Sequence, residues 1–223
     1  MQITPIAHIK TDFTEKFGIP RQSGRAKSLT ATIVFESQFR KDDSLRGIEG
    51  FSHLWLIFDF SKAHQKEYSP TVRPPRLGGN TRIGVFASRS PFRPNSLGLS
   101  SVKLLEVRKT QNEGTVLIVG GADLLDGTPI YDIKPYLPSD KIESAFGGYA
   151  EDFVFNKLEV VFSQELKNLL PPQLIDPIVE CLADDPRPSY HEDGRVYGMS
   201  YSGYNVKFLV ENNTLTVLEI VKQ

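Results

Sequence analysis

Hydrophobic and polar residues alternate with a period of two over most of the first 135 residues. In the segment 29–35, for example, Leu29, Ala31, Ile33 and Phe35 fall on one face. Such alternation is typical of β-strands, whose side chains point to opposite sides in turn. The same pattern, interrupted by Gly, Pro and Asn, predicts further strands at Ile3–Lys10, His53–Phe60, Arg82–Ser88, Ser100–Arg108, Thr115–Gly120 and Pro129–Ile133.

These short strands, with little helix between them, favour a mainly β fold in which residues 1–146 form an antiparallel β-barrel. The pattern changes near Gly147 and Gly148, where the composition turns acidic. We therefore expect residues 147–223 to form a smaller α+β C-terminal domain.

The C-terminal segment shows both the alternation typical of strands and the spacing typical of amphipathic helices. Asn212-Asn213 separates its last two strands and is a plausible tight hairpin turn, because asparagine tolerates positive φ. The predicted elements are a strand at Asn156–Phe162, helices at Ser163–Leu170 and Leu174–Leu182, and strands at Tyr204–Glu211 and Thr214–Ile220.

Charge is divided unevenly along the chain. Residues 1–110 hold 18 Lys/Arg against 9 Asp/Glu, whereas residues 111–223 hold 8 against 18. No carboxylate lies between Glu67 and Glu106, a stretch that contains Arg73, Arg76, Arg82, Arg89, Arg93 and Lys103. A positive field from this stretch attracts a polyanion, although the same arginines could instead form a solvated face that pairs with the acidic half.

Several classes of protein and site are excluded. No apolar stretch approaches 18 residues and no leader pattern opens the chain, so we expect a cytoplasmic protein without a membrane span. Cys181 has no partner for a disulfide or a zinc site, and the four histidines are too scattered to suggest a metal centre. The usual nucleotide-binding and hydrolase motifs are absent.

Four polar blocks suit ligand binding better than core packing. Pro20-Arg21-Gln22 presents two polar side chains on a stiffened backbone. The runs 73–80 and 86–95 combine arginines with Pro, Gly and Phe, a mixture that suits phosphates and bases. Asp123–Pro129 ends in a glycine turn, and an aspartate there could accept hydrogen bonds from a ribose or an amino group. Each block alone could also be an ordinary surface turn or linker.

Together these blocks resemble the TsaA-like family, the tRNA adenine-N6 methyltransferases that act on threonylcarbamoyladenosine beside the anticodon. The resemblance covers most of the chain, and the blocks occur in the same order. It rests on Pro20–Gln22, Arg46–Trp55, Arg73–Asn95, Asp123–Pro129, Asp132–Tyr136 and Asp185–Pro188.

The resemblance implies an S-adenosylmethionine site on the barrel, a homodimer with that site close to the subunit boundary, and tRNA as partner. Ser61 and Lys62 stand where some relatives have a His-Gln pair, so a contact through their backbone is expected. Carried over by position, the cofactor site consists of Pro20, Arg21, Gln22, Ser61, Lys62, Arg89, Leu99, Asp123, Leu124, Leu125 and Asp126.

Methyl transfer from a sulfonium is an in-line displacement that depends mainly on positioning, so no covalent nucleophile is expected. The acceptor nitrogen must lose a proton, and Asp126 is a candidate base by placement alone. Arg73, Arg76 and Arg93 are expected to contact phosphates. Two alternatives remain open at this point: a non-enzymatic RNA-binding barrel, which leaves the acidic Asp123–Asp126 block unexplained, and a methyltransferase for a small molecule, which does not need so many arginines.

Overall fold

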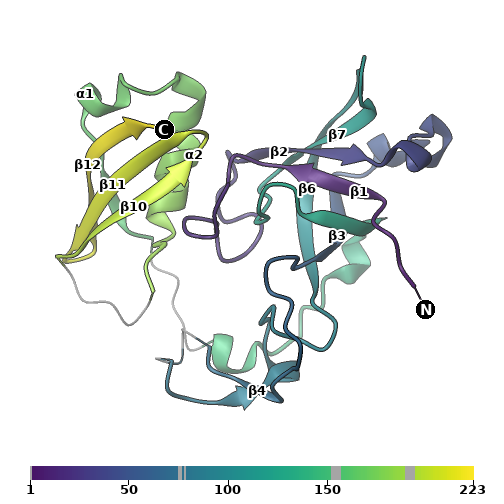
Figure 1. The fold of residues 1–223 in the computed structure, drawn as a ribbon, viewed down its shortest axis with the longest axis horizontal. Coiled ribbons are helices and arrows are strands. Elements are labelled where there is room, and N and C mark those ends of the chain that lie inside the picture. Colours follow the sequence, from purple (N-terminus) through teal and green to yellow (C-terminus); the bar gives the residue numbers. More distant parts are fainter. Residues whose placement is uncertain (1, 75–76, 78, 152–156, 189–193) are drawn as a thin grey trace.

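The computed structural model describes residues 2–74, 77, 79–151, 157–188 and 194–223. Most of the regular structure is β (Figure 1), which confirms the predicted class. Six antiparallel strands pair in a closed ring and form a barrel in the order β1-β2-β7-β6-β3-β8. The six are β1 (Ala7–Lys10), β2 (Thr30–Phe35), β3 (His53–Asp59), β6 (Leu97–Thr110), β7 (Gly114–Gly120) and β8 (Pro129–Pro135).

The barrel is filled by the apolar positions of the predicted alternation. Ile9, Ile33, Leu54, Leu56 and Leu117 are fully buried inside it. Burial of such a side chain stabilises the fold by about 1.5–3 kcal/mol. A slip of one residue between two strands would turn these side chains out to solvent, so their burial fixes the register of strand pairing.

One predicted strand is wrong in most of its length. Of the segment Arg82–Ser88, only β5 (Ile83–Gly84) is extended, and it pairs with the equally short β4 (Thr71–Val72) outside the barrel. A 3₁₀ turn, Val85–Ala87, follows directly. Val85 is buried whereas Phe86 is 75% exposed, so the apolar residues here do not line a sheet face.

The C-terminal unit is a four-stranded sheet, ordered β10-β11-β12-β9, that packs against helix α2 (Pro172–Ala183). Its strands are β9 (Glu159–Val161), β10 (Val196–Tyr201), β11 (Tyr204–Glu211) and β12 (Thr214–Lys222). Asn212 and Asn213 both have positive φ, so the predicted Asn-Asn hairpin turn is confirmed. The sequence analysis missed β10, and Asn156 of the predicted first strand lies outside the described residues.

The predicted helix Ser163–Leu170 is shorter than expected. Helix α1 spans only Gln164–Lys167, capped at its start by the Ser163 hydroxyl, which accepts a hydrogen bond from the Leu166 N–H. Two prolines follow, and Pro172 opens α2 at the first helical position, where a proline is well tolerated.

The connection between β1 and β2 packs against the C-terminal unit (Figure 1). Phe13, Ala26 and Leu29 share a core with the buried face of the C-terminal sheet and α2. The N–H and hydroxyl of Ser28 both donate to Glu180 of α2, each at 2.9 Å. The two units are therefore held together by the β1–β2 connection, which joins two strands of the barrel but packs into the core of the C-terminal unit.

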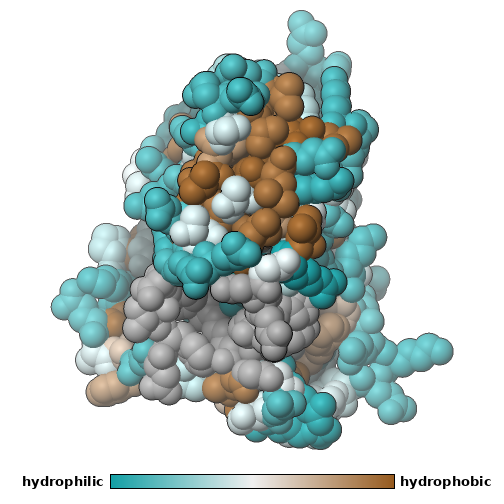
Figure 2. All heavy atoms as spheres, turned by 90° about the vertical axis from the view of Figure 1, so that its left-hand side faces the viewer, coloured by the Kyte–Doolittle hydropathy of each residue, from teal (hydrophilic) through white to brown (hydrophobic). Residues whose placement is uncertain are grey.

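The surface of the C-terminal unit carries an apolar patch. Figure 2 shows hydrophobic residues gathered on the side that faces left in Figure 1. Val161, Val196, Leu218 and Val221 of its strands are all exposed. Among the helices of the described ranges, none is long and apolar enough to cross a membrane.

Candidate functional site

Three long connections emerge at the same end of the barrel. They are residues 11–29 between β1 and β2, 60–96 between β3 and β6, and 121–128 between β7 and β8. The antiparallel registers place the end of one strand beside the start of the next: Lys10 pairs with Thr32, Asp59 with Leu97, and Thr30 with Gly120. Every predicted cofactor residue lies on these connections or, for Leu99, near the start of β6. The ring thus brings together segments that are a hundred residues apart in sequence.

Asp123 is the most unusual group at this end. Its carboxylate is largely buried, and burial raises its pKa above the ordinary value, although hydrogen bonds from the Ser100 hydroxyl and the Ser23 N–H and the charge of Arg89 oppose the rise. Its Oδ1 atom has no hydrogen-bond partner among the described residues. An unsatisfied buried acceptor costs about 1–3 kcal/mol, so this oxygen is suited to a donor from a ligand.

The orphaned oxygen of Asp123 also tests whether an adenosine-bearing cofactor fits. A ribose hydroxyl or an adenine amine is a hydrogen-bond donor of the kind that this acceptor lacks. Gln22 is half-buried and directly precedes Ser23, whose backbone N–H lowers the pKa of Asp123, and the exposed Arg89 on the connection 60–96 lowers it through its charge. The residues present therefore fit such a cofactor.

Arg21, one of the predicted cofactor residues, makes contacts with the C-terminal unit. Its guanidinium donates to the carbonyl oxygens of Asp185 and Arg187, at 3.3 and 2.6 Å, and so ties the first connection to the C-terminal unit. Pro20 is buried beside it. A cavity of about 390 Å³ lies here, lined by Lys16, Phe17, Gly18, Ile19, Pro20, Arg21, Cys181, Asp184, Asp185 and Pro186.

The three residues after Asp123 serve mainly to hold the connection in place. Leu124 is buried in the barrel core, and Leu125 packs against the core of the C-terminal unit. The carboxylate of Asp126, the candidate base, accepts a hydrogen bond of 3.0 Å from the Thr11 N–H. Within this block, Asp123 is the residue with a buried carboxylate oxygen that lacks a partner among the described residues, whereas Asp126 is exposed.

The same barrel end carries three further predicted cofactor residues, Ser61, Lys62 and Leu99. Ser61 and Lys62 are exposed directly after β3, and the Lys62 carbonyl accepts a hydrogen bond of 3.2 Å from the Lys16 ammonium. Leu99 points outward from β6 with 58% of its surface exposed. An exposed leucine beside a polar site is a natural contact for the apolar part of a ligand or for a second subunit.

The arginines predicted to contact phosphates differ in their surroundings. Arg73 is exposed, and Arg76 lies outside the described residues. Arg93 is half-buried: its guanidinium donates to the carbonyls of Val85 and Ser88, at 3.2 and 2.7 Å, and lies over the Phe86 ring. Arg93 therefore shapes its own loop.

Sequence reasoning missed two groups at this end. Ser100 was not singled out, although a serine at an inward position of an apolar strand is itself a signal. Asp59, only 7% exposed, lies at the end of β3, and His64 Nε2 is 2.7 Å from its Oδ1. The four histidines are too scattered in sequence to suggest a metal centre, and the spacing alone does not identify Asp59 as the partner of His64. No cluster that could hold a metal ion occurs in the described part of the chain.

Comparisons with known proteins agree with this geometry. Residues 8–141 match the family model described as tRNA-methyltransferase O N-terminal domain, and residues 156–223 match the TrmO C-terminal domain. The chain is 42% identical to the tRNA (adenine(37)-N6)-methyltransferase of Escherichia coli, over 94% of this chain and 93% of that protein. A probable S-adenosyl-L-methionine-binding protein of Pyrococcus abyssi is 35% identical over 77% of this chain and 91% of its own.

A solved structure, that of TrmO from Pseudomonas aeruginosa, superposes on the whole chain and on 97% of its own length, with a TM-score of 0.77 and 33% identity. The same family is indicated by the two family-model matches, by the identity along nearly the full length of the sequence and by the shared fold. The chain therefore belongs to the TrmO family of tRNA methyltransferases.

Proposed function

We propose that this chain transfers a methyl group from S-adenosylmethionine to N6 of threonylcarbamoyladenosine at position 37 of tRNA. The observation that carries the proposal is the near end-to-end identity of 42% to a tRNA (adenine(37)-N6)-methyltransferase. The barrel end supports it, because an unsatisfied buried carboxylate and exposed arginines lie on the same set of connections.

The residues that hold the cofactor are proposed to be Asp123, Gln22, Arg89 and Leu99, with backbone contacts from 61–62 and 124–126. When bound, S-adenosylmethionine supplies an electrophilic methyl group on a sulfonium. Asp123 accepts a hydrogen bond from the cofactor through Oδ1. Ser100, Ser23 and Arg89 lower the pKa of this carboxyl against the effect of burial, which favours the ionised acceptor that a ligand donor needs.

The substrate side is proposed to lie along the arginine-rich connection 60–96. The threonylcarbamoyl group bears a carboxylate, which a guanidinium can bind in a bidentate manner. Arg73 and Arg82 are exposed there and can reach an anion without breaking an existing loop contact. A tRNA substrate also places the enzyme in the cytoplasm.

We further propose a homodimer that forms over the outward face of β6. Leu97, Leu99 and Leu105 project from this strand and are 37%, 58% and 46% exposed, apolar side chains that a lone subunit leaves in water, with the polar Ser101 and Lys103 between Leu99 and Leu105. Leu99 is also a proposed cofactor contact, so an interface here lies close to the cofactor. The proposed domains are 1–146 and 147–223.

The proposal is tested by incubating the protein with S-adenosylmethionine carrying a tritiated methyl group and a cell extract. Acid-precipitable label that ribonuclease releases is expected. Label confined to the small-molecule fraction contradicts the tRNA assignment, and absence of label despite cofactor binding in calorimetry contradicts the enzymatic one.

A further inference from the structure

The pair formed by Asp59 and His64 has the geometry of an oriented base. Asp59 is 7% exposed at the end of β3, and its Oδ1 lies 2.7 Å from His64 Nε2. The His64 side chain is 60% exposed, so the ring stands at the surface on a buried carboxylate. This is the arrangement in which a carboxylate fixes the orientation and tautomer of an imidazole.

The tautomer of the His64 imidazole follows from its hydrogen-bond partner, the Asp59 carboxylate. An ionised carboxylate only accepts hydrogen bonds, so Nε2 carries the proton and Nδ1 carries the lone pair. Within the described residues no hydrogen bond is made to Nδ1. Tyr131 of β8 is affected by the charge of the same carboxylate: burial raises the pKa of its phenol, and the negative charge of Asp59 raises it further. Tyr131 therefore stays protonated near Asp59 and does not compete as a base.

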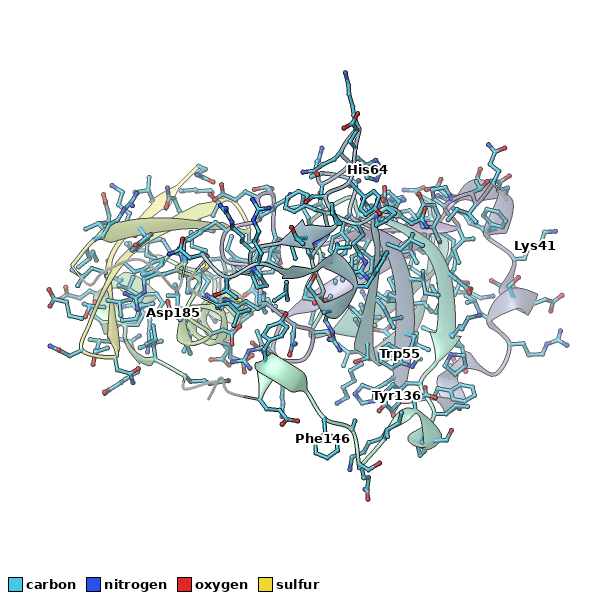
Figure 3. The ribbon with its side chains drawn as sticks, turned by 90° about the horizontal axis from the view of Figure 1, so that it is seen from below. Lys41, Trp55, His64, Tyr136, Phe146 and Asp185 are labelled. Carbon is cyan, nitrogen blue, oxygen red and sulfur yellow. The ribbon has the colours of Figure 1, made fainter. Side chains whose placement is uncertain are left out.

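The pair lies close to the proposed cofactor site. Leu56 is in register with Ser100, whose hydroxyl opposes the rise in the pKa of Asp123, and Asp59 follows three residues later on the same strand. At about 3.3 Å per residue, the backbone of Asp59 lies roughly 10 Å along β3 from the position opposite Ser100. Asp59 also pairs with Leu97, two residues from Leu99. Figure 3 shows His64 well apart from Trp55 and Tyr136, the aromatic pair near the other ends of β3 and β8.

We propose that His64, oriented by Asp59, accepts the proton that the acceptor nitrogen loses during methyl transfer. The inference rests on the proposed function. The N6 lone pair forms the new bond to the methyl carbon while the methyl–sulfur bond breaks, its electron pair passing to sulfur. The N6 proton moves to His64 Nδ1, and the resulting imidazolium is stabilised by the Asp59 carboxylate until the proton leaves to water. His64 is then a catalytic residue, and Asp59 is a positioning residue.

The test is His64→Ala with His8→Ala as the matched control. His8 is also paired with a carboxylate, Glu36, at 3.1 Å, but neither residue lies on the connections that carry the proposed site, and the Glu36 side chain is 44% exposed rather than buried. We expect His64→Ala to lower kcat about 100-fold or more, the usual contribution of a general base, with KM for tRNA changed by less than threefold. His8→Ala should retain wild-type kcat. Asp59→Asn keeps an acceptor for Nε2–H but lacks the charge, so an intermediate loss is expected.

Two readouts separate catalysis from structure. Added imidazole should restore at least a tenth of the lost rate to His64→Ala, because the ring is exposed, and should leave His8→Ala unaffected. In nuclear magnetic resonance of the wild type, which has four histidines, the His64 ring signal should shift when modified tRNA is added with S-adenosylhomocysteine. The His8 signal should not shift.

The proposal is overturned if His64→Ala keeps at least half of the wild-type kcat, or if it loses activity together with cofactor affinity and without imidazole rescue. Failure of the proposed function is distinguishable. In that case the wild type itself does not methylate modified tRNA under conditions in which calorimetry shows that it binds the cofactor.

Discussion

At the scale of single residues, buried polar groups carry more information than exposed ones. Asp123 and Asp59 both place a carboxylate in a poorly solvated position at the same barrel end, which costs stability unless a partner compensates. Asp59 has His64 as a partner, whereas one oxygen of Asp123 has none in the described chain. A protein that retains such an oxygen trades stability for binding.

Asp123→Asn should therefore affect stability and binding in opposite directions. Folding raises the pKa of this carboxyl, so its contribution to stability is favourable below its unfolded pKa and is lost as pH rises through the higher folded value. At neutral pH, removing the charge should raise the melting temperature of the ligand-free protein by about 2–4 °C, the shift expected for about 1 kcal/mol at this size.

The same substitution should weaken S-adenosylmethionine binding by about 1.5–3 kcal/mol, the usual worth of a hydrogen bond to a charged group. Scanning calorimetry and titration calorimetry measure the two effects. Asp126→Asn is the control, because the Asp126 carboxylate is engaged by the Thr11 N–H, and its cofactor affinity should stay near wild type. Unchanged affinity in Asp123→Asn removes this residue from the site.

At the scale of elements, the sequence predicted the strands well where one face is buried and poorly where no sheet surrounds them. The inward rows of β2 and β3 follow directly from their alternation. Arg82–Ser88 shows similar apolar spacing but lies on a connection outside the barrel, where only Ile83–Gly84 is extended and Val85–Ala87 forms a 3₁₀ turn. Strand β10 was not predicted, although Tyr197, Met199 and Tyr201 alternate as buried positions; Gly198 and Ser200 between them are residues that β-strands do not favour or only weakly favour.

The candidate site was predicted in its outline and missed in its contacts. The resemblance to a family indicated which blocks matter, and the ring of strands explains why they meet. The roles of Arg21 and Arg93, which donate to backbone carbonyls, depend on chain segments that only the fold brings close. Periodicity and spacing contain no information about such long-range hydrogen bonds.

Within the arginine-rich connection, Arg73 and Arg93 should respond differently to substitution. Arg73→Ala removes an exposed charge and should reduce the slope of log affinity for tRNA against log salt by roughly one, with an unchanged melting curve. Arg93→Ala also removes two carbonyl contacts and should lower the melting temperature. Filter binding across salt concentrations measures the slope. An unchanged slope in Arg73→Ala contradicts a phosphate contact there.

At the scale of the whole molecule, two groups of exposed apolar side chains among the described residues bear on assembly. One is the set of outward leucines on β6, and the other is the patch on the C-terminal sheet seen in Figure 2. These leucines lie beside the proposed cofactor site and form the surface that we assign to the dimer. The patch on the C-terminal sheet lies on the face of the C-terminal unit that points away from the barrel.

Leu105→Glu should therefore convert the dimer to a monomer, because it places a charge in the proposed interface. The matched control is Val221→Glu, at a comparably exposed apolar position of β12. Light scattering at micromolar concentration reports the mass. A wild-type monomer of 25.0 kDa contradicts the dimer, and dissociation by Val221→Glu alone moves the interface to the C-terminal sheet.

The central claim is the identity of the methylated atom. The most direct test is nucleoside mass spectrometry of tRNA incubated with the protein and S-adenosylmethionine carrying a deuterated methyl group. Matched tRNA with and without the threonylcarbamoyl group should differ sharply, since the substituent acidifies N6 and offers an anion to arginine. We predict label only on N6 of threonylcarbamoyladenosine at position 37. Label on another base, or equal labelling of the unmodified transcript, contradicts the account.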